Sequence, residues 1–381
     1  MAQPKDSDIP LGRQQQRSII QAQLSSGLPK GTRFAAVELG GMSIRVAIAE
    51  DSPENIVDRK TYKTLSPADT IPPIVEWLRE RQPFSSLGIA SFGPIDPRPE
   101  SKTFGFITST PKVEWRNFDL YGAFDVFGVP MAFDTDVNAP ALFEYLHHRQ
   151  FVDPRITSCA YITVGTGVGI GLVINGKPVH GLLHPEAGHI PYPRLKDDPF
   201  NGLAGYAVPE GCEANSSAVA LAQRAGLDSP DGLKDLPDDH PVWEKAVHYL
   251  AGVCVSIILV ASAEKIVIGG GVLNRKSLFP AIRKEVQRVL NGYIQVESIT
   301  TDQIEQYIVP AIHENDAGII GALALSEAAL AKSEEGGKGT AAAADAAAGD
   351  GDTKSESLSY LTSAVVGALT ALALHRMLPK L

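Results

Sequence analysis

Three glycine-rich turns are the first candidates for chemistry in this sequence. They lie in VELGGMSI (37–44), VGTGVGIG (164–171) and KIVIGGGV (265–272), each beside an apolar run of β-forming residues. Glycine weakens a strand interior, so such clusters mark turns or places where something approaches the backbone closely. The backbone N–H groups of a glycine turn form a concave nest that binds anions such as phosphate. A single turn of this kind is usually a hairpin connection, whereas three of them favour a bound nucleotide.

The turns recur within an alternation of predicted strands and helices. Residues 34–39, 44–50 and 55–63 are predicted as strands, and residues 159–175 repeat the strand–turn–strand pattern of residues 34–50. PPIVEWLRERQ (72–82) is predicted as a helix with both prolines in its first turn. A duplicated β-hairpin that opens each of two α/β halves is the organisation of the actin-like, ribonuclease-H-like ATPase fold. We therefore predict two such domains, 32–157 and 158–330, around a cleft.

Composition limits the classes of function. A chain of 381 residues with 44% hydrophobic residues is long enough for two domains with sizeable cores. The net charge of −10, with no basic patch to offset it, argues against nucleic acid as a partner. The three cysteines, Cys159, Cys212 and Cys254, exclude a disulfide framework and indicate a reducing compartment.

Both ends of the chain differ from its body. Residues 1–31 form a polar arm without the apolar core of a secretory signal, and we expect it to be disordered. Residues 331–357 are rich in alanine, glycine and acidic residues and are predicted to form a flexible linker. Residues 358–374 are apolar and uncharged and precede the basic HRMLPKL. As a helix they would span about 25 Å, slightly less than a hydrocarbon core of about 30 Å.

The apolar tail is predicted to be a membrane anchor over residues 358–378. Ser363, Gly367 and Ala371 form a row of small residues suited to helix contact in a bilayer. The tail resembles the anchors of organelle outer membranes, of which the mitochondrial one fits best, with the two domains in the cytosol. The alternative is an amphipathic helix that docks on the body of a soluble cytoplasmic protein.

Five long segments carry the most specific signal, and they follow one another in this order: SFGPID (91–96), TSTPKVEWRNFDL (108–120), TDVNAPALFEY (135–145), ITVGTGVGIGLVINGK (162–177) and HPEAGHI (184–190). They resemble the ROK family of sugar kinases, most closely its fructokinase branch, over about residues 34–330. The resemblance implies transfer of the γ-phosphoryl group of ATP to a hexose hydroxyl with Mg²⁺. The fructokinase branch implies that the reaction converts fructose to fructose 6-phosphate. Homodimers are common in that family, although this sequence does not itself show one.

The resemblance also assigns residues. Asp136 matches the catalytic base, for which the alternative reading is the N-cap of the next helix, a place that Thr135 or Asn138 could take. The residues that match the sugar pocket are Gly93, Pro94, Thr110, Lys112, Asn138, Glu186 and His189. Lys112 could equally be a solvated surface lysine. The residues that match the ATP site are Glu38, Gly40, Gly41, Ser43, Gly165, Thr166, Gly167, Gly169, Gly269, Gly270 and Gly271.

Three departures from the family pattern stand out. His189 and Cys212 are remnants of a zinc site whose other ligands are missing, so we expect no structural zinc. Met42 occupies the place of a threonine, and its thioether cannot donate a hydrogen bond to phosphate. Asn315-Asp316 reverses the usual order of the two residues, with little consequence expected.

These departures keep a second function open. A catalytically weak or inactive sugar- and nucleotide-binding protein, acting as a membrane sensor or scaffold, is the alternative to the enzyme. A kinase of the same family for another hexose, such as glucose or an N-acetylhexosamine, is the alternative within the enzyme class. The family's transcriptional repressors need a DNA-binding module, for which the arm is too short.

Overall fold

A computed structural model describes residues 28–196, 198–205 and 208–348 of the chain. The chain divides into two units, residues 1–330 and 331–381. The first unit holds both predicted α/β halves.

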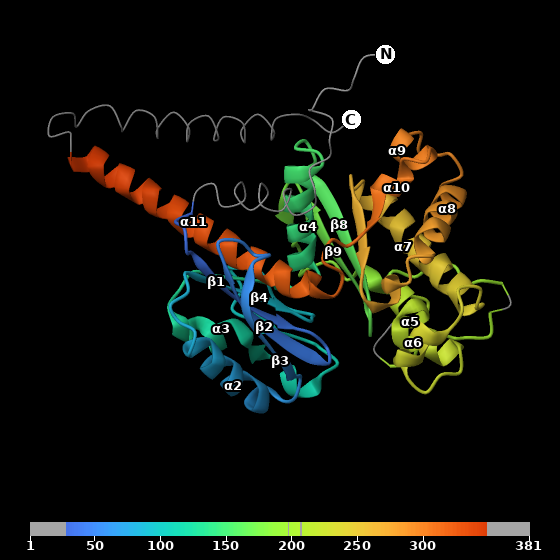
Figure 1. Cartoon of the computed structure of the whole chain (residues 1–381), viewed down its shortest axis with the longest axis horizontal. Helices are drawn as coiled ribbons and strands as arrows, with labels where there is room; N and C mark the ends of the chain where they lie inside the picture. The colour runs from blue at the N-terminus through green and yellow to red at the C-terminus, as the bar shows by residue number, and fades with distance from the viewer. Residues whose placement is uncertain (1–27, 197, 206–207, 349–381) are drawn as a thin grey trace, which may run out of the picture. The chain divides into compact units, whose positions relative to one another are not determined.

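The first unit contains two five-stranded sheets with the same topology (Figure 1). Their strand orders are β3-β2-β1-β4-β7 and β10-β9-β8-β11-β12. In each sheet the first three strands are antiparallel neighbours and the last three are parallel neighbours. The predicted duplication is therefore confirmed at the level of strand order.

The strands of the first sheet are β1 (Arg33–Leu39), β2 (Ser43–Glu50), β3 (Ile56–Lys63), β4 (Ser86–Ser91) and β7 (Met131–Thr135). Those of the second are β8 (Ser158–Val164), β9 (Val168–Ile174), β10 (Lys177–Pro178), β11 (Ile266–Gly269) and β12 (Ile308–Pro310). A small ribbon pairs β5 (Phe106–Ile107) with β6 (Phe118–Asp119). Strand β4 is buried along its whole length and β3 at the sheet edge is not, as expected when a sheet is covered on both faces.

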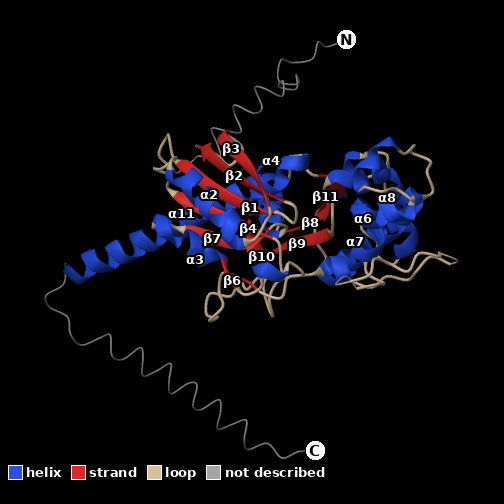
Figure 2. Ribbon diagram, turned by 90° about the horizontal axis from the view of Figure 1, so that it is seen from below, coloured by secondary structure: helices blue, strands red, loops and turns tan. Residues whose placement is uncertain are grey.

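The helices of the described residues connect and cover these sheets (Figure 2). They are α2 (Pro67–Arg79), α3 (Leu120–Phe124), α4 (Asn138–Phe151), α5 (Cys212–Ser216), α6 (Ala218–Arg224), α7 (Val242–Ala261), α8 (Leu278–Leu290), α9 (Glu297–Thr300), α10 (Ile304–Tyr307) and α11 (Ala317–Ala348).

Helix α2 starts earlier than predicted. Its N-cap is Ser66, whose side chain accepts a hydrogen bond from the Asp69 N–H, and Pro67 occupies the first helical turn. Pro72 and Pro73 therefore lie inside the helix and not in its first turn. The prediction was wrong because it took this proline pair as the start signal and overlooked the serine–proline pair before it.

Helices α4 and α11 fill the space between the two sheets. A methyl group on Gly88 of β4 would collide with the Ala322 carbonyl of α11, and one on Gly171 of β9 would collide with the Val137 carbonyl, next to α4. The two helices also cross closely, because a Cβ on Gly321 would collide with the Pro140 nitrogen. One core cluster accordingly takes residues from both sheets and both helices. This shared core joins the two halves into a single unit.

Two further findings concern the end of the chain. Helix α11 continues through residues 331–348, a stretch predicted to be flexible linker; alanine and glutamate there are strong helix formers. The remainder of that linker, the apolar tail and residues 1–27 lie outside the described residues. Among the described residues, α7 is long and apolar enough to cross a membrane (20 residues, mean hydropathy 1.6), and 56% of its most apolar window is buried within the protein.

Candidate active site

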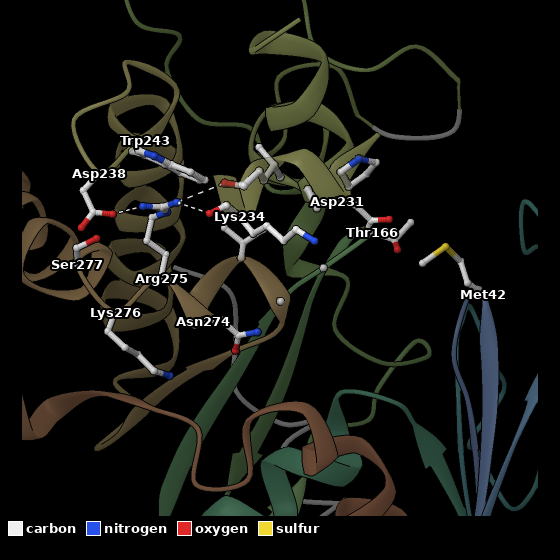
Figure 3. A pocket seen from close by; sticks show the side chains of 16 residues that line it. Met42, Thr166, Asp231, Lys234, Asp238, Trp243, Asn274, Arg275, Lys276 and Ser277 are labelled. Carbon is white, nitrogen blue, oxygen red and sulfur yellow. Dashed lines mark hydrogen bonds and ion pairs between the residues drawn. The ribbon is translucent and has the colours of Figure 1, made fainter. Parts of the chain in front are cut away.

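One cavity receives residues from all three glycine turns (Figure 3). It measures about 690 Å³ and is lined by Met42 from the first turn, Gly165 and Thr166 from the second, and Gly271 from the third. The rest of its lining comes from residues 218–243 and 272–277. Ligand pockets typically measure about 300–1,000 Å³, so this cavity has room for a nucleotide.

Three cationic side chains line the cavity, and they differ in their partners. Arg275 pairs with Asp238 and stacks on Trp243, its guanidinium carbon 4.4 Å from the ring centroid. Lys276 pairs with Glu314 at 2.9 Å. Lys234 makes no ion pair with any described residue, and Figure 3 shows its side chain reaching into the cavity towards Thr166. Lys234 is therefore the cation available to a bound anion.

The first turn is a tight hairpin between β1 and β2. The Gly40 N–H donates to the Ser43 carbonyl at 3.0 Å, and the Thr64 hydroxyl donates to the Gly40 carbonyl at 2.9 Å. Gly41 has open space around its Cα, and Met42 is 71% exposed at the edge of the cavity. The side chain at position 42 thus meets whatever ligand occupies the cavity.

The second turn contains two glycines, and the two that follow do a different job. The Gly165 N–H donates to the Gly167 carbonyl at 2.9 Å, which closes the turn. Gly169 lies in β9, where a Cβ would come within 2.6 Å of the Val137 side chain. The structure thus places Gly169 against the start of α4. Its missing side chain makes room for this helix, and its assignment to the ATP site stays a prediction.

The third turn divides its roles in the same way. Gly269 ends β11, with a Cβ position 2.9 Å from the Tyr161 hydroxyl. Gly270 has a φ of 89°, a left-handed conformation that favours glycine, and lies against the Val164 backbone. Of the three, Gly271 is the residue that lines the cavity.

Asp136 follows the end of β7. Its backbone N–H donates to the Ser91 carbonyl of β4 at 2.9 Å. Its carboxylate accepts no hydrogen bond from another described residue. The N-cap of α4 is Val137, and the first helical N–H, that of Asn138, donates to the Thr135 hydroxyl at 2.9 Å. Desolvation, with the charges of Glu38 and Glu186, raises the pKa of Asp136 to about 7. An unpartnered carboxylate with such a pKa suits a general base near neutral pH.

Asp134, which the sequence analysis missed, holds this turn in place. It is buried, and its Oδ1 accepts from the Thr135 N–H at 2.7 Å and from the Asn138 amide at 2.9 Å. Its Oδ2 lies 2.9 Å from Nε2 of His180 in the second half, and this hydrogen bond raises the pKa of His180. The DTD sequence offered a signal, since a buried strand residue that carries a charge needs a partner.

Asn138, predicted to line the sugar pocket, is fully buried. Its amide donates to Asp134, and its carbonyl oxygen accepts from the Leu172 N–H of β9 at 3.1 Å. Both ends of the side chain are thus used within the protein, and Asn138 ties α4 to the second sheet.

Gly93 and Glu186 meet across the two halves. A Cβ on Gly93 would lie 3.2 Å from Oε1 of Glu186 and 3.0 Å from Cε1 of His184. Desolvation raises the pKa of Glu186, although His184 and His189 oppose this effect. Pro94 fixes the neighbouring loop, because its carbonyl accepts from the Thr108 N–H at 2.8 Å. These contacts bring the Glu186 carboxylate close to the backbone at Gly93.

Thr110 and Lys112 lie beside this segment. Thr110 is buried, and its carbonyl accepts from Nε of Arg116 at 2.7 Å, which holds the loop in place. The Lys112 ammonium lies 5.7 Å from the ring centroid of Phe92, the residue before Gly93. The structure therefore keeps Lys112 near the segment that contains Gly93.

Comparison with known proteins agrees with this geometry. Residues 34–329 match the model of the ROK family. The chain belongs to the ROK family. A fructokinase of Pediococcus pentosaceus is 34% identical over 78% of this chain and 98% of its own. A fructokinase of Zymomonas mobilis is 35% identical over 78% of this chain and 97% of its own.

Solved structures of ROK proteins share the fold. A ROK hexokinase from Thermus thermophilus aligns with a TM-score of 0.62 at 20% identity, over 79% of this chain and all of its own. A ROK glucokinase from Streptomyces griseus, solved in complex with glucose and AMPPNP, aligns with a TM-score of 0.60 at 20% identity, over 77% of this chain and 99% of its own.

Glu38, predicted to belong to the ATP site, already has a cationic partner within the protein. It is buried on β1 and paired with Arg45, whose Nε lies 2.6 Å from its Oε2. Its carboxylate also lies against Gly318 in the first turn of α11, where the helix dipole favours negative charge. Desolvation nevertheless raises the pKa of Glu38, with Arg45 opposing it.

The two remnants of the zinc site, His189 and Cys212, have different partners. His189 lies 3.9 Å from Oε1 of Glu213, measured from its Nε2. The Cys212 thiol is buried and contacts the Ser216 hydroxyl at 3.0 Å, and burial raises its pKa to about 12. No group of three or more histidine, cysteine or acidic residues suited to a metal occurs in the part of the chain that the structure describes.

The reversed Asn315-Asp316 pair has more structural use than expected. Asp316 pairs with Arg45 at 3.4 Å and with Arg59 at 3.0 Å, both on strands of the first sheet. The Asn315 carbonyl accepts from the same Arg45 guanidinium. This pair therefore fastens the start of α11 to the first sheet.

Proposed function

We propose that this protein transfers the γ-phosphoryl group of ATP to fructose and releases fructose 6-phosphate and ADP. The observation that carries the proposal is that one chain combines a nucleotide-sized cavity with a carboxylate suited to act as a base. A nucleotide-sized cavity receives all three glycine turns, and the carboxylate of Asp136, with a pKa of about 7, has no partner among the described residues. The curated fructokinases at 34% and 35% identity support fructose as the acceptor.

The residues of this chain divide the reaction between them. In the cavity, Lys234 and the turn N–H groups near Gly165 and Gly271 would hold the phosphates. On the sugar side, Glu186 would accept hydrogen bonds from sugar hydroxyls. Asp136 would take the proton of the attacking hydroxyl as its oxygen bonds to the γ-phosphorus and the bond to the β-phosphate oxygen breaks.

The acidic residues of the cleft fit Mg²⁺ bound together with ATP. Mg²⁺ usually takes one or two protein carboxylates, waters and substrate phosphates, and does not need a closed protein cage. Glu38, already paired with Arg45, would reach the ion through a bound water. The Glu38 charge also raises the pKa of Asp136, a cost that a nearby cation would relieve. When bound, the ion supplies positive charge against the charge that develops on the phosphates.

The test is a coupled assay of ATP consumption on the full-length protein with a panel of hexoses. We expect fructose-dependent turnover that Asp136→Asn abolishes. Turnover with glucose or an N-acetylhexosamine in place of fructose would keep the kinase and change the substrate. If the protein binds ATP but phosphorylates no sugar, the proposal that it is an enzyme is refuted.

Met42 favours one second candidate, a sugar- and nucleotide-binding protein without turnover. It is 71% exposed at the cavity and offers phosphate no hydrogen-bond donor. The same assay decides between the two functions.

We also propose that the apolar tail, residues 358–374, anchors the protein in an organelle membrane, with the mitochondrial outer membrane first. Its length, lack of charge and basic end support the proposal. A fluorescent protein fused to residues 331–381 should outline an organelle membrane. A diffuse cytosolic signal would refute the membrane anchor.

A further inference from the structure

His184 connects the sugar-side segments of the two halves. It lies between β10 and the short 3₁₀ helix at residues 187–189, and its side chain is only 2% exposed. Its Nε2 lies 3.0 Å from the backbone nitrogen of Ile95, which follows Gly93 and Pro94 in the first half. This contact is a direct hydrogen bond from one half of the molecule to the other.

The donor of this bond fixes the tautomer of His184. A backbone N–H can only donate, so Nε2 must accept, and the neutral ring carries its proton on Nδ1. That N–H donates to the Pro185 carbonyl at 3.3 Å and lies 3.7 Å from Oε1 of Glu186. One edge of the ring therefore faces the Gly93–Ile95 segment, and the other faces Glu186.

We propose that His184 is a positioning residue for the hexose: it holds the Gly93–Ile95 backbone at a fixed distance from the Glu186 carboxylate, so that both segments contact one sugar. The inference rests on the proposed function, because it assigns the same site to a sugar. It also accounts for the tight approach at Gly93, whose Cβ position lies 3.0 Å from the ring of His184. Any side chain at Gly93 would push this ring away.

Loss of the ring should act on sugar affinity first. Without an acceptor, the N–H of Ile95, whose side chain is fully buried, loses its partner, and the loop can move away from Glu186. The nucleotide cavity contains neither His184 nor Ile95 among its lining residues. ATP affinity should therefore stay unchanged.

The test measures fructose binding to the full-length protein by calorimetry without ATP, and then steady-state kinetics. We expect His184→Ala to raise the fructose Kd and KM about tenfold or more, the size of one lost buried hydrogen bond. The KM for ATP should stay within about twofold of the wild-type value, because His184 does not line the nucleotide cavity.

Two matched variants separate positioning from general destabilisation. In His184→Gln the side-chain Oε1 stands as many bonds from Cα as Nε2 does, so it can accept from Ile95 and should restore most of the affinity. His184→Asn, whose oxygen is one bond shorter, should not. The control is His248→Gln, at a histidine of α7 whose Nε2 bonds the Pro193 carbonyl, and it should bind fructose like wild type.

The outcomes are distinct from those of the proposed function. Wild type that neither binds nor phosphorylates any of fructose, glucose, mannose or N-acetylglucosamine would overturn the proposed function and this inference with it. Wild type that binds one of these sugars, with His184→Ala binding it equally well, would overturn the positioning role alone. The role is also overturned if folded His184→Gln is as weak as His184→Asn.

Discussion

Replacing Asp136 with asparagine tests the chemistry and the electrostatics of the cleft together. Asparagine has nearly the same shape but cannot accept a proton. General-base catalysis contributes about 10²–10⁴-fold in rate, and we expect kcat to fall by that amount. The sugar and ATP should still bind, because the side chain has no hydrogen-bond partner in the described structure that the change would release.

The wild-type pH profile gives the second part of the prediction. The pKa of Asp136 is raised from 3.8 to about 7, mainly by desolvation. The base must be ionised, so kcat/KM should fall about tenfold for each pH unit below 7 and level off above it. A carboxylate with an ordinary pKa would instead keep full activity down to about pH 5.

The folding stability of the wild-type protein should fall as pH rises, whereas kcat/KM should rise. The carboxyl group binds its proton more tightly in the folded state than in the unfolded state, so folding loses stability as pH rises from 3.8 to about 7. One pKa unit corresponds to about 1.4 kcal/mol, so the ionised group costs the folded protein a few kcal/mol at pH 8. Asp136→Asn removes that cost and should raise Tm at pH 8 by several degrees, with no gain at pH 4.

The assay combines ATP-consumption rates from pH 5 to 9 with thermal unfolding at pH 4 and pH 8. Asp228→Asn, at an exposed aspartate whose side chain has no hydrogen bond or ion pair with a described residue, is the control and should change neither. The reasoning is refuted if Asp136→Asn keeps more than about a tenth of the wild-type rate, given the expected contribution of a base. A lower Tm for Asp136→Asn at pH 8 would refute the electrostatic part alone.

The remaining predictions concern the nucleotide cavity and the lost metal. Met42→Thr supplies a hydroxyl donor and should raise kcat/KM for ATP by up to about tenfold, while an unchanged rate would mean that Ser43 or the backbone already suffices. Lys234→Ala should weaken ATP binding about tenfold or more and leave adenosine binding unchanged, because only ATP carries the phosphates. Its control is Lys284→Ala, on the exposed face of α8. Equal losses of affinity for ATP and adenosine would refute the contact between Lys234 and the phosphates. Elemental analysis should find zinc well below one ion per chain, since the Cys212 thiol is held protonated by burial and a zinc ligand must be a thiolate; a stoichiometric amount would show that other ligands complete the site.

Local sequence patterns predicted much of the fold. Apolar β-forming runs beside glycine turns located β1, β2, β8 and β9, and the repeated hairpin indicated the duplicated sheets. These features depend on neighbours along the chain, since a hairpin and its turn are set by a few consecutive residues. The start of α2 was predicted wrongly for the same reason, because two local start signals competed within six residues.

The roles of individual glycines needed the tertiary structure. In VGTGVGIG all four glycines look alike, yet Gly165 lines the cavity while Gly169 and Gly171 make room for the start of α4. That helix approaches β9 from a distant part of the chain. No local pattern reports such an approach, because it depends on how the two sheets pack around α4 and α11.

The sequence by itself determined the duplicated α/β plan, the three glycine turns and the position of Asp136 after a buried strand. It did so because strand runs, turns and strand ends are written in consecutive residues. The tertiary structure alone decided the partners: Asp134 with His180, Ile95 with His184, and Glu38 with Arg45. The first two pairs join the two halves of the molecule, and such contacts exist only once the shared core has brought both sheets together.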